Sequence, residues 1–528
     1  MSKAAPDSGG GFHPGFNPWV IALTVTLATF MEVLDTSIAN VALPYIAGGL
    51  SSTQEESTWV LTSYLVSNAI ILPISGWLAT RIGRKRFYMM CVALFTGSSF
   101  LCGLAPSLGT LIFFRVLQGL GGGGLAPSEQ SILSDTFEPK KRGMAFAIYG
   151  MAVVLAPAIG PTLGGWITDH VSWRWIFFLN VPVGLMSLML TSRIVQDPPW
   201  LKEQQKKKSP IDGMGLGLVA LGLGSLEVVL DKGQEDDWFS SNFIVVFSIL
   251  AVVGILGFIV WELFQKNPVV DLKLFKNRNF AVSNLLIFFL GFVLFGTTVL
   301  LPQFLQLFMG YTAEEAGMTL SPGALSIILF MPIIGILVGK VSARYLIAIG
   351  FVLTAIALWR MTDINLQIDF KTAVFWRVWQ SAGMAFLFIP ITTACYVGVP
   401  KEKNNDVSGM LNLSRNVGGS FGISFVSTYL ARHAQAHQNF LVQHATPFDS
   451  SYQSMIHGAT GVLVEKGIAM ASATRAAQGQ IFQELAKQAQ VLAYKDLLTV
   501  MTFAAVAIVP IVFLLKKNDP SEGTGAAA

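Results

Sequence analysis

Two carboxylates, Glu32 and Asp35, stand three positions apart inside one of the most apolar stretches of the chain, "TFMEVLDTSIANVALP" (29–44). A charged side chain at membrane depth costs on the order of several kcal/mol unless it is paired or hydrated, so it normally faces a cavity or the interior of a helix bundle. A carboxyl group there can take up and release a proton. This pattern predicts proton exchange, with Asp35 as the principal site.

Composition places this stretch in a membrane protein. Of the 528 residues, 53% are hydrophobic and 12% are charged, whereas soluble domains usually carry about 25% charged residues. Apolar runs long enough to cross about 30 Å of hydrocarbon recur from end to end. We expect an all-α polytopic membrane protein with about fourteen spans, in the ranges 18–41, 58–80, 87–105, 109–135, 142–168, 174–195, 212–231, 242–265, 280–308, 316–339, 344–361, 372–398, 406–431 and 496–515.

Lysines and arginines between the spans predict the orientation, because positively charged loops stay cytoplasmic. Every second break is basic, from the one that holds Arg84 to the one that holds Lys516, whereas alternate breaks such as "AGGLSSTQEEST" and "MGYTAEEAG" carry no Lys or Arg. Both termini are therefore expected in the cytoplasm, and the first span is interpreted as a retained helix. The net charge of +4 is attributed to this topology rather than to nucleic-acid binding.

Short repeats predict two related six-helix halves, since transporters are often built from repeats. "LPISGWLATR" (72–81) resembles "MPIIGILVGK" (331–340) at an offset of 259 residues, and "FRVLQG" (114–119) resembles "WRVWQS" (376–381) at an offset of 262. The expected divisions are a cytoplasmic tail, an N-terminal half, a linker with two inserted helices, a C-terminal half that includes a periplasmic loop at 432–493, and a second tail: 1–17, 18–195, 196–266, 280–515 and 516–528.

Arg115 is the expected partner of Asp35. Asp35 lies about 24 Å along the first span from its cytoplasmic end, and Arg115 lies about one turn into the fourth span from the opposite side, so the two meet at a similar depth. Two interpretations stay open: a static structural pair, or a carboxyl that exchanges a proton as a cavity alternates between the two sides, with Arg115 adjusting its pKa. Glu32, one turn away, either shares this proton site or points towards the outer part of the cavity.

Other polar residues inside the spans are candidates for contact with a substrate, because such residues usually face a cavity. They are Gln118, Arg377 and Gln380 at repeat-related positions, Glu129 nearer the cytoplasm, and Glu227 in an inserted span. The 38 Phe, 18 Met and 12 Trp residues supply material for an adaptable apolar wall, although most such residues face lipid or pack helices. The run "GLGGGGLAPSEQ" (119–130) is interpreted as a place of close helix contact or local unwinding, not as a nucleotide-binding loop.

Five motifs resemble the signature set of major facilitator drug:proton antiporters: "LDTSIANVALP" (34–44), "GWLATRIGRKR" (76–86), "RVLQG" (115–119), "APAIGPTLGGWI" (156–167) and "WRWIFFLNVPVG" (173–184). Later stretches, including "NPVVDLKLFKNRNF" (267–280), are similar to the fourteen-span, EmrB-type inner-membrane pumps of Gram-negative bacteria. The resemblance covers nearly the whole chain. It implies a major facilitator fold in the bacterial inner membrane and export of hydrophobic, amphipathic or cationic compounds in exchange for protons, without a cofactor.

The resemblance also assigns two groups of residues. A gating loop is formed by Gly76, Gly83, Arg84, Lys85 and Arg86, and an antiporter helix by Gly160, Pro161, Gly164 and Gly165. Thr80 stands where many relatives carry the carboxylate that closes the loop, so the latch is expected to be weaker or to use another acid. Without the resemblance, the basic residues are equally a positive-inside anchor, and Pro161 with its glycines is a kink that allows close packing.

The periplasmic loop 432–493 is the least hydrophobic region and contains four of the six histidines. Their spacing is too irregular to predict a metal site, whereas 466–496 is interpreted as helical. The resemblance implies that periplasmic surfaces engage a membrane-anchored adaptor protein and, through it, an outer-membrane channel. No enzyme activity is expected. Two other functions stay open: a narrow-specificity exporter of an endogenous metabolite or lipid, and a non-transporting membrane scaffold.

Overall fold

The computed structural model describes residues 15–201, 212–265 and 268–516, and within these ranges the chain is helical with no strand. Twelve described helices are long and apolar enough to cross a membrane, or thirteen if the two arms of the bent α7 count as one span. A further helix of 39 residues, α17 (Asn404–Val442), is more polar and packs against α3 and α13. This count is compatible with fourteen spans. Most of the two expected tails lies outside the described residues.

The N-terminal helices, as we call α1 to α9, form one group around the first span. Their bounds are α1 (Pro18–Gly49), α2 (Gln54–Ser57), α3 (Trp59–Ile82), α4 (Arg84–Leu104), α5 (Leu108–Gly122), α6 (Leu125–Thr136), α7 (Pro139–His170), α8 (Trp175–Phe178) and α9 (Asn180–Ile194). The long helix α1 packs against α7 and α9, while α5 packs against α3 and α4. These contacts bring the first and fourth spans close enough for their polar side chains to interact.

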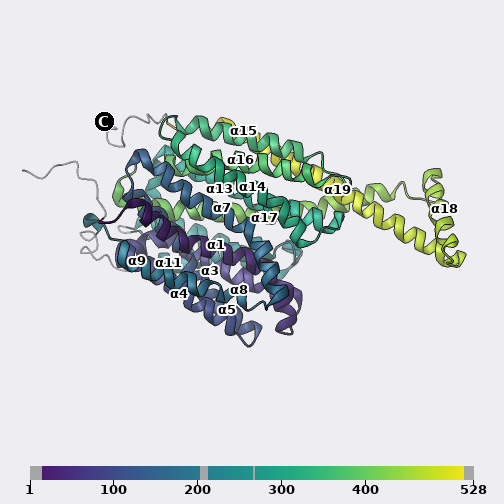
Figure 1. The fold of residues 1–528 in the computed structure, drawn as a ribbon, viewed down its shortest axis with the longest axis horizontal. Coiled ribbons are helices and arrows are strands. Elements are labelled where there is room, and N and C mark those ends of the chain that lie inside the picture. The colour runs from purple at the N-terminus through teal and green to yellow at the C-terminus, as the bar shows by residue number, and fades with distance from the viewer. Residues whose placement is uncertain (1–14, 202–211, 266–267, 517–528) are drawn as a thin grey trace, which may run out of the picture.

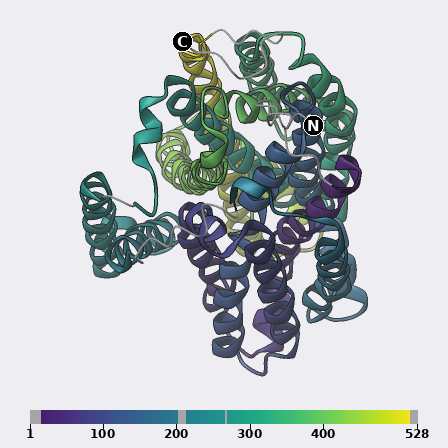
Figure 2. The same ribbon diagram turned by 90° about the vertical axis from the view of Figure 1, so that its left-hand side faces the viewer.

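The C-terminal helices, α13 to α19, form the second group. Besides α17, their bounds are α13 (Arg278–Met309), α14 (Ala313–Leu337), α15 (Ala343–Met361), α16 (Phe370–Cys395), α18 (Ser450–Glu465) and α19 (Met470–Val512), with 3-10 turns η2 (Leu272–Lys276) and η3 (Lys401–Lys403). The two groups meet where α14 packs on α7 and where α17 packs on α3 and α6. Figure 2 shows the N-terminal helices in purple and blue beside the C-terminal helices in green.

The two inserted helices stand at the edge of this bundle (Figure 2). Helix α11 (Gly213–Lys232) packs against α3 and α17, whereas α12 (Asn242–Phe264), which follows the short turn η1 (Trp238–Ser240), packs on α11. Aliphatic side chains such as Ile249, Val252 and Leu256 are exposed on α12. In a membrane these residues contact lipid tails, so their exposure costs nothing there.

Glycine and proline shape the helices that carry the polar residues. The fourth span is broken at the glycine run, because α5 ends at Gly122 and α6 begins at Leu125, as the sequence indicated. Gly83, between α3 and α4, has a φ of 103°, which a residue with a side chain rarely adopts. Helix α7 bends by 43° between its arms Lys140–Pro157 and Ile159–His170.

The opposite ends of the bundle differ in character. At one end, which we call the basic end, lie Lys85, Lys140 and Lys403. At the other, α17 and α19 continue beyond the bundle and, with α18, form a projecting helical hairpin (Figure 1). The expected helical segment 466–496 is therefore confirmed from Met470 onward, as the first part of α19.

Candidate functional site

A buried ion pair joins the first and fourth spans. Asp35 on α1 and Arg115 on α5 lie 2.6 Å apart, and their side chains are 1% and 0% exposed. The Asp35 carboxylate also accepts hydrogen bonds from the amides of Gln118 (3.1 Å) and Asn180 (2.6 Å). The arginine donates further to the Val60 carbonyl at 3.1 Å. Such a pair needs several partners of this kind, because desolvation of two charges otherwise exceeds their attraction.

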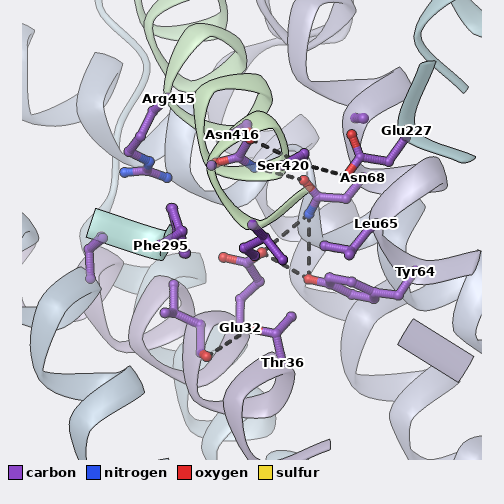
Figure 3. Close-up of a pocket in the computed structure, with 15 residues that line it drawn as sticks. Glu32, Thr36, Tyr64, Leu65, Asn68, Glu227, Phe295, Arg415, Asn416 and Ser420 are labelled. Atoms are coloured by element: carbon purple, nitrogen blue, oxygen red, sulfur yellow. Dashed lines mark hydrogen bonds between the residues drawn. The ribbon is translucent and has the colours of Figure 1, made fainter. Parts of the chain in front are cut away.

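A cavity of about 130 Å³ lies beside this pair, where the N-terminal helices, the C-terminal helices and α11 meet (Figure 3). Its polar lining comprises Glu32, Thr36, Tyr64, Asn68, Glu227, Arg415, Asn416 and Ser420, among apolar residues that include Leu65 and Phe295. Binding sites for drug-sized ligands usually measure about 300–1,000 Å³. A drug-sized compound can therefore enter only if the helix groups separate.

Glu32 connects the cavity with the ion pair through Tyr64. The Tyr64 hydroxyl donates to the Glu32 carboxylate at 2.8 Å, and Asn68 donates to the same oxygen at 3.2 Å. The aromatic ring of Tyr64 lies 4.3 Å from the Arg115 guanidinium, a cation–π distance. Tyr64 is thus the single residue that separates Glu32 from the Arg115–Asp35 pair. Asp35 itself does not line the cavity.

Glu227 and Arg415 give the cavity its remaining charges. Glu227, from α11, accepts a hydrogen bond from the Ser420 hydroxyl at 2.6 Å. Arg415, from α17, donates to the Tyr149 hydroxyl at 2.8 Å, and Tyr149 in turn donates to Asn412 at 3.0 Å. With both carboxylates ionised and one arginine, the lining carries one net negative charge, which attracts a cation.

The remaining predicted cavity residues lie elsewhere. Gln118 belongs to the ion-pair network, and Glu129 accepts from the Thr26 hydroxyl at 2.5 Å in a fully buried position. Arg377 donates to Gln380 at 2.8 Å, the same distance that separates Arg115 and Gln118. The Gln380 amide donates to Thr297 at 2.7 Å. None of these side chains lines the 130 Å³ cavity.

Polar contacts at the basic end hold the two helix groups together. Arg84 pairs with Asp135 at 2.5 Å, and both side chains are buried. The second oxygen of Asp135 accepts from the Asn404 amide of α17 at 2.7 Å, and the Ser131 and Ser408 hydroxyls lie 2.7 Å apart. Asp135 on α6 is therefore the carboxylate that pairs with Arg84, whereas position 80 holds a threonine. Thr80 accepts a weaker bond from Asn405 at 3.2 Å.

Two other gating-loop residues have distinct partners. The backbone amide of Lys85 donates to Asp197 at 2.8 Å, and its ammonium donates to the Ser192 carbonyl at 2.6 Å. A Cβ on Gly76 would lie 2.8 Å from the Asn405 carbonyl oxygen, so glycine permits the close approach of α3 and α17. Arg86 is exposed.

The glycines of the α7 motif have unequal roles. A side chain on Gly160 would overlap Ser37 of α1, and one on Gly164 would lie 2.9 Å from Ile38 of the same helix. A Cβ on Gly165 meets open space. Pro161 lies inside α7, close after the 43° bend. Two of the three glycines therefore permit the close α1–α7 packing that places Asp35.

Sequence reasoning missed several residues of the site, of which Arg415 is the most informative. It is an intramembrane arginine in "NLSRNVGG" (412–419), and the rule that identified Arg115 applies to it equally. Tyr64, Asn68 and Asn180 were not predicted, because neutral polar residues in a span rarely reveal their partners.

Comparison with known proteins places this architecture in a family. A model of the Major Facilitator Superfamily matches residues 25–423. The chain belongs to the major facilitator superfamily. It is similar to the multidrug export protein EmrB of Escherichia coli strain K12, with 36% identity over 510 residues, covering 96% of this chain and 97% of EmrB. The fatty acid resistance protein FarB of Neisseria gonorrhoeae is 37% identical over 508 residues, covering 96% and 97%.

A solved structure of the proton:xylose symporter XylE is similar in fold to this superfamily member. Its TM-score is 0.55 at 17% identity, and the match covers 84% of this chain and 94% of XylE. Together with EmrB, this likeness confirms the predicted fold class and the predicted EmrB-type resemblance. The chain is thus a multi-pass membrane protein of the transporter superfamily.

Proposed function

We propose that this protein is a proton-coupled antiporter that exports hydrophobic or amphipathic compounds, cationic ones among them, across the bacterial inner membrane. The similarity to the multidrug export protein EmrB supports drug efflux. The observation that carries the proposal is the cavity between the helix groups, where two carboxylates and one arginine converge. Cations and protons compete for the same carboxylates there, which is the requirement for exchange.

The proposed coupling runs from Glu32 to Asp35. Glu32 faces the cavity and binds either a cationic substrate or a proton. Tyr64 and Arg115 transmit the resulting change of charge to Asp35. Protonation of Asp35 would release Arg115 and break the ion pair that links α1 to α5. The predicted halves, 18–195 and 280–515, would then rock about the cavity so that it opens alternately to each side.

The proposed orientation of the protein in the membrane follows from the distribution of charged residues. The basic end is the cytoplasmic end, because lysine-rich loops stay inside, so the hairpin of α17, α18 and α19 extends into the periplasm. Its projection beyond the bundle favours a role as a docking surface for an adaptor protein that leads to an outer-membrane channel (Figure 1). Both termini would then be cytoplasmic.

Transport into proteoliposomes tests the coupling. The native protein should accumulate a fluorescent cationic dye against its gradient when a proton gradient is imposed, and Glu32→Gln and Asp35→Asn should each abolish this accumulation. Glu55→Gln, which changes an exposed acid near the periplasmic end of α1, is the matched control and should transport normally. Downhill exchange of dye without a proton gradient reports folding, because it requires no coupling.

The outcomes separate the alternatives. Accumulation that survives both substitutions would refute the assigned proton site. Native protein that exchanges no dye but carries a fatty acid would favour a narrow-specificity exporter. The cationic Arg415 in the cavity and the similarity to the fatty acid resistance protein FarB support that alternative. Failure to move any compound under a gradient would favour a scaffold.

A further inference from the structure

Two histidines of α17 and an aspartate of α19 lie close together where these two helices pack against each other. His433 and His437 are four positions apart on α17, so they share one face of the helix, and Asp496 faces them from α19. One Asp496 oxygen lies 2.7 Å from His437 Nε2 and 3.5 Å from His433 Nδ1. The three potential ligand atoms all lie within 4.8 Å of one another.

This set of atoms matches the requirements of a transition-metal ion. Imidazole nitrogens and a carboxylate oxygen are zinc ligands, and three protein ligands with a fourth position for water form a common coordination sphere. Two histidines one helical turn apart are a recurring zinc-binding arrangement. We propose that His433, His437 and Asp496 bind a divalent transition-metal ion of the zinc class.

The geometry requires only small side-chain movements. Zinc–ligand bonds are about 2.0–2.2 Å long, so a bound ion needs its ligand atoms about 3.5 Å apart. The His433–Asp496 distance of 3.5 Å already fits, and the His437–Asp496 distance of 2.7 Å must widen as the ion displaces the proton that these two groups share.

The surroundings position the ligands and leave the site accessible. The ring of Tyr429 stacks on His433 with centroids 3.8 Å apart and planes inclined by 10°, which limits the orientations of that imidazole. The side chains of His433, His437 and Asp496 are 40%, 27% and 42% exposed, so a hydrated ion can reach them. Within the described residues, this is the one group of three metal-ligating side chains that lie so close together.

Binding would join α17 to α19 at the base of the hairpin. Beyond this point the hairpin has a small core of its own, comprising Leu463, Ala473 and Ala477. An ion that links the two helices at their exit from the bundle fixes the direction in which the hairpin projects. A hydrogen-bonded histidine–aspartate pair would hold the helices less rigidly, because it constrains one contact rather than three.

Zinc titration of the full-length protein tests the site. Protein purified in detergent with a tag that contains no histidine is titrated with Zn²⁺ by isothermal calorimetry. We expect one ion per chain, and His437→Gln or Asp496→Asn should weaken the affinity by at least about 10–100-fold. His444→Gln and His457→Gln change histidines elsewhere in the hairpin and should leave the affinity unchanged.

A conservative variant separates loss of a ligand from loss of folding. His437→Cys supplies a thiolate, which is also a zinc ligand, and should bind Zn²⁺ more tightly than His437→Gln does. Absence of Zn²⁺ binding by the native protein would overturn the proposal, as would binding that is unaffected by His437→Gln. Variants that elute as monodisperse species on size exclusion are folded, and only these are compared.

Discussion

The bond between Asn404 and Asp135 is expected to set how often the basic end opens. Asn404 of α17 donates to the buried Asp135 of α6 at 2.7 Å, and this contact can exist only while the two helix groups are closed at that end. A hydrogen bond to a charged group contributes about 1.5–3 kcal/mol. Since about 1.4 kcal/mol corresponds to a tenfold change in an equilibrium constant, Asn404→Ala should shift the equilibrium towards the open form about 10- to 100-fold.

The assay measures distances across the basic end. The cysteines Cys91, Cys102 and Cys395 are all buried, so spin labels can be attached at Lys140→Cys and Lys401→Cys, both exposed positions on opposite helix groups. Double electron–electron resonance should show a longer-distance population that grows in Asn404→Ala.

A control substitution removes an amide that does not cross between the groups. Among the described residues, the Asn365 side chain bonds to backbone atoms of Asp363 and Gln367 alone, in the loop before α16. Asn365→Ala should therefore leave the distance distribution unchanged. If Asn404→Ala gives the same distribution as the native protein, the assignment of this contact as a gate is refuted.

Three further predictions concern the ion pair, the α7 motif and the cavity. Arg115→Met leaves the buried Asp35 without its cation and should lower the free energy of unfolding by about 3–5 kcal/mol, measured as a lower Tm in detergent. Gly160→Val should abolish dye transport, because its side chain overlaps α1, whereas Gly165→Ala, which meets open space, should transport normally. Glu227→Gln should weaken binding of a cationic dye more than binding of a neutral one, as measured by fluorescence titration, because it removes one negative charge from the cavity.

The sequence predicted the helical membrane fold, the family and the Asp35–Arg115 contact, because each leaves a recognisable pattern in the residues themselves. Apolar length identifies a span, and an unpaired charge in a span needs a partner. The Asp135 latch could not be predicted from Thr80 alone, since the replacing acid lies 55 positions further along the chain. Glu32 and Glu227 were among the residues expected near a cavity, but its full lining could not be predicted, because it depends on how α11 and α17 pack on α3.

The histidine cluster illustrates the same limit. The spacing of His433, His437, His444 and His457 gives no metal pattern by itself, and the third ligand, Asp496, comes from a helix that returns antiparallel after the whole hairpin. Only the packing of α17 against α19 brings it near. Contacts within one helix can be read from spacing, whereas contacts between helices require the fold.

The two arginine–glutamine units explain why coupling is assigned to one group of helices. Arg115–Gln118 and Arg377–Gln380 have the same spacing and the same 2.8 Å hydrogen bond. Thr297 stands 262 positions after Asp35, the offset that relates the arginine motifs, and it receives the Gln380 amide as Asp35 receives that of Gln118.

Only the unit in the N-terminal helices therefore contains a group that can exchange a proton. Within the described residues Arg377 has hydroxyl and amide partners but no carboxylate, which shows that the fold accommodates such an arginine without an ion pair. Asp35 is thus not required merely to place an arginine at this position in the fold. Its presence beside Arg115, one tyrosine away from the cavity, fits the proposed proton exchange better than it fits a packing role alone.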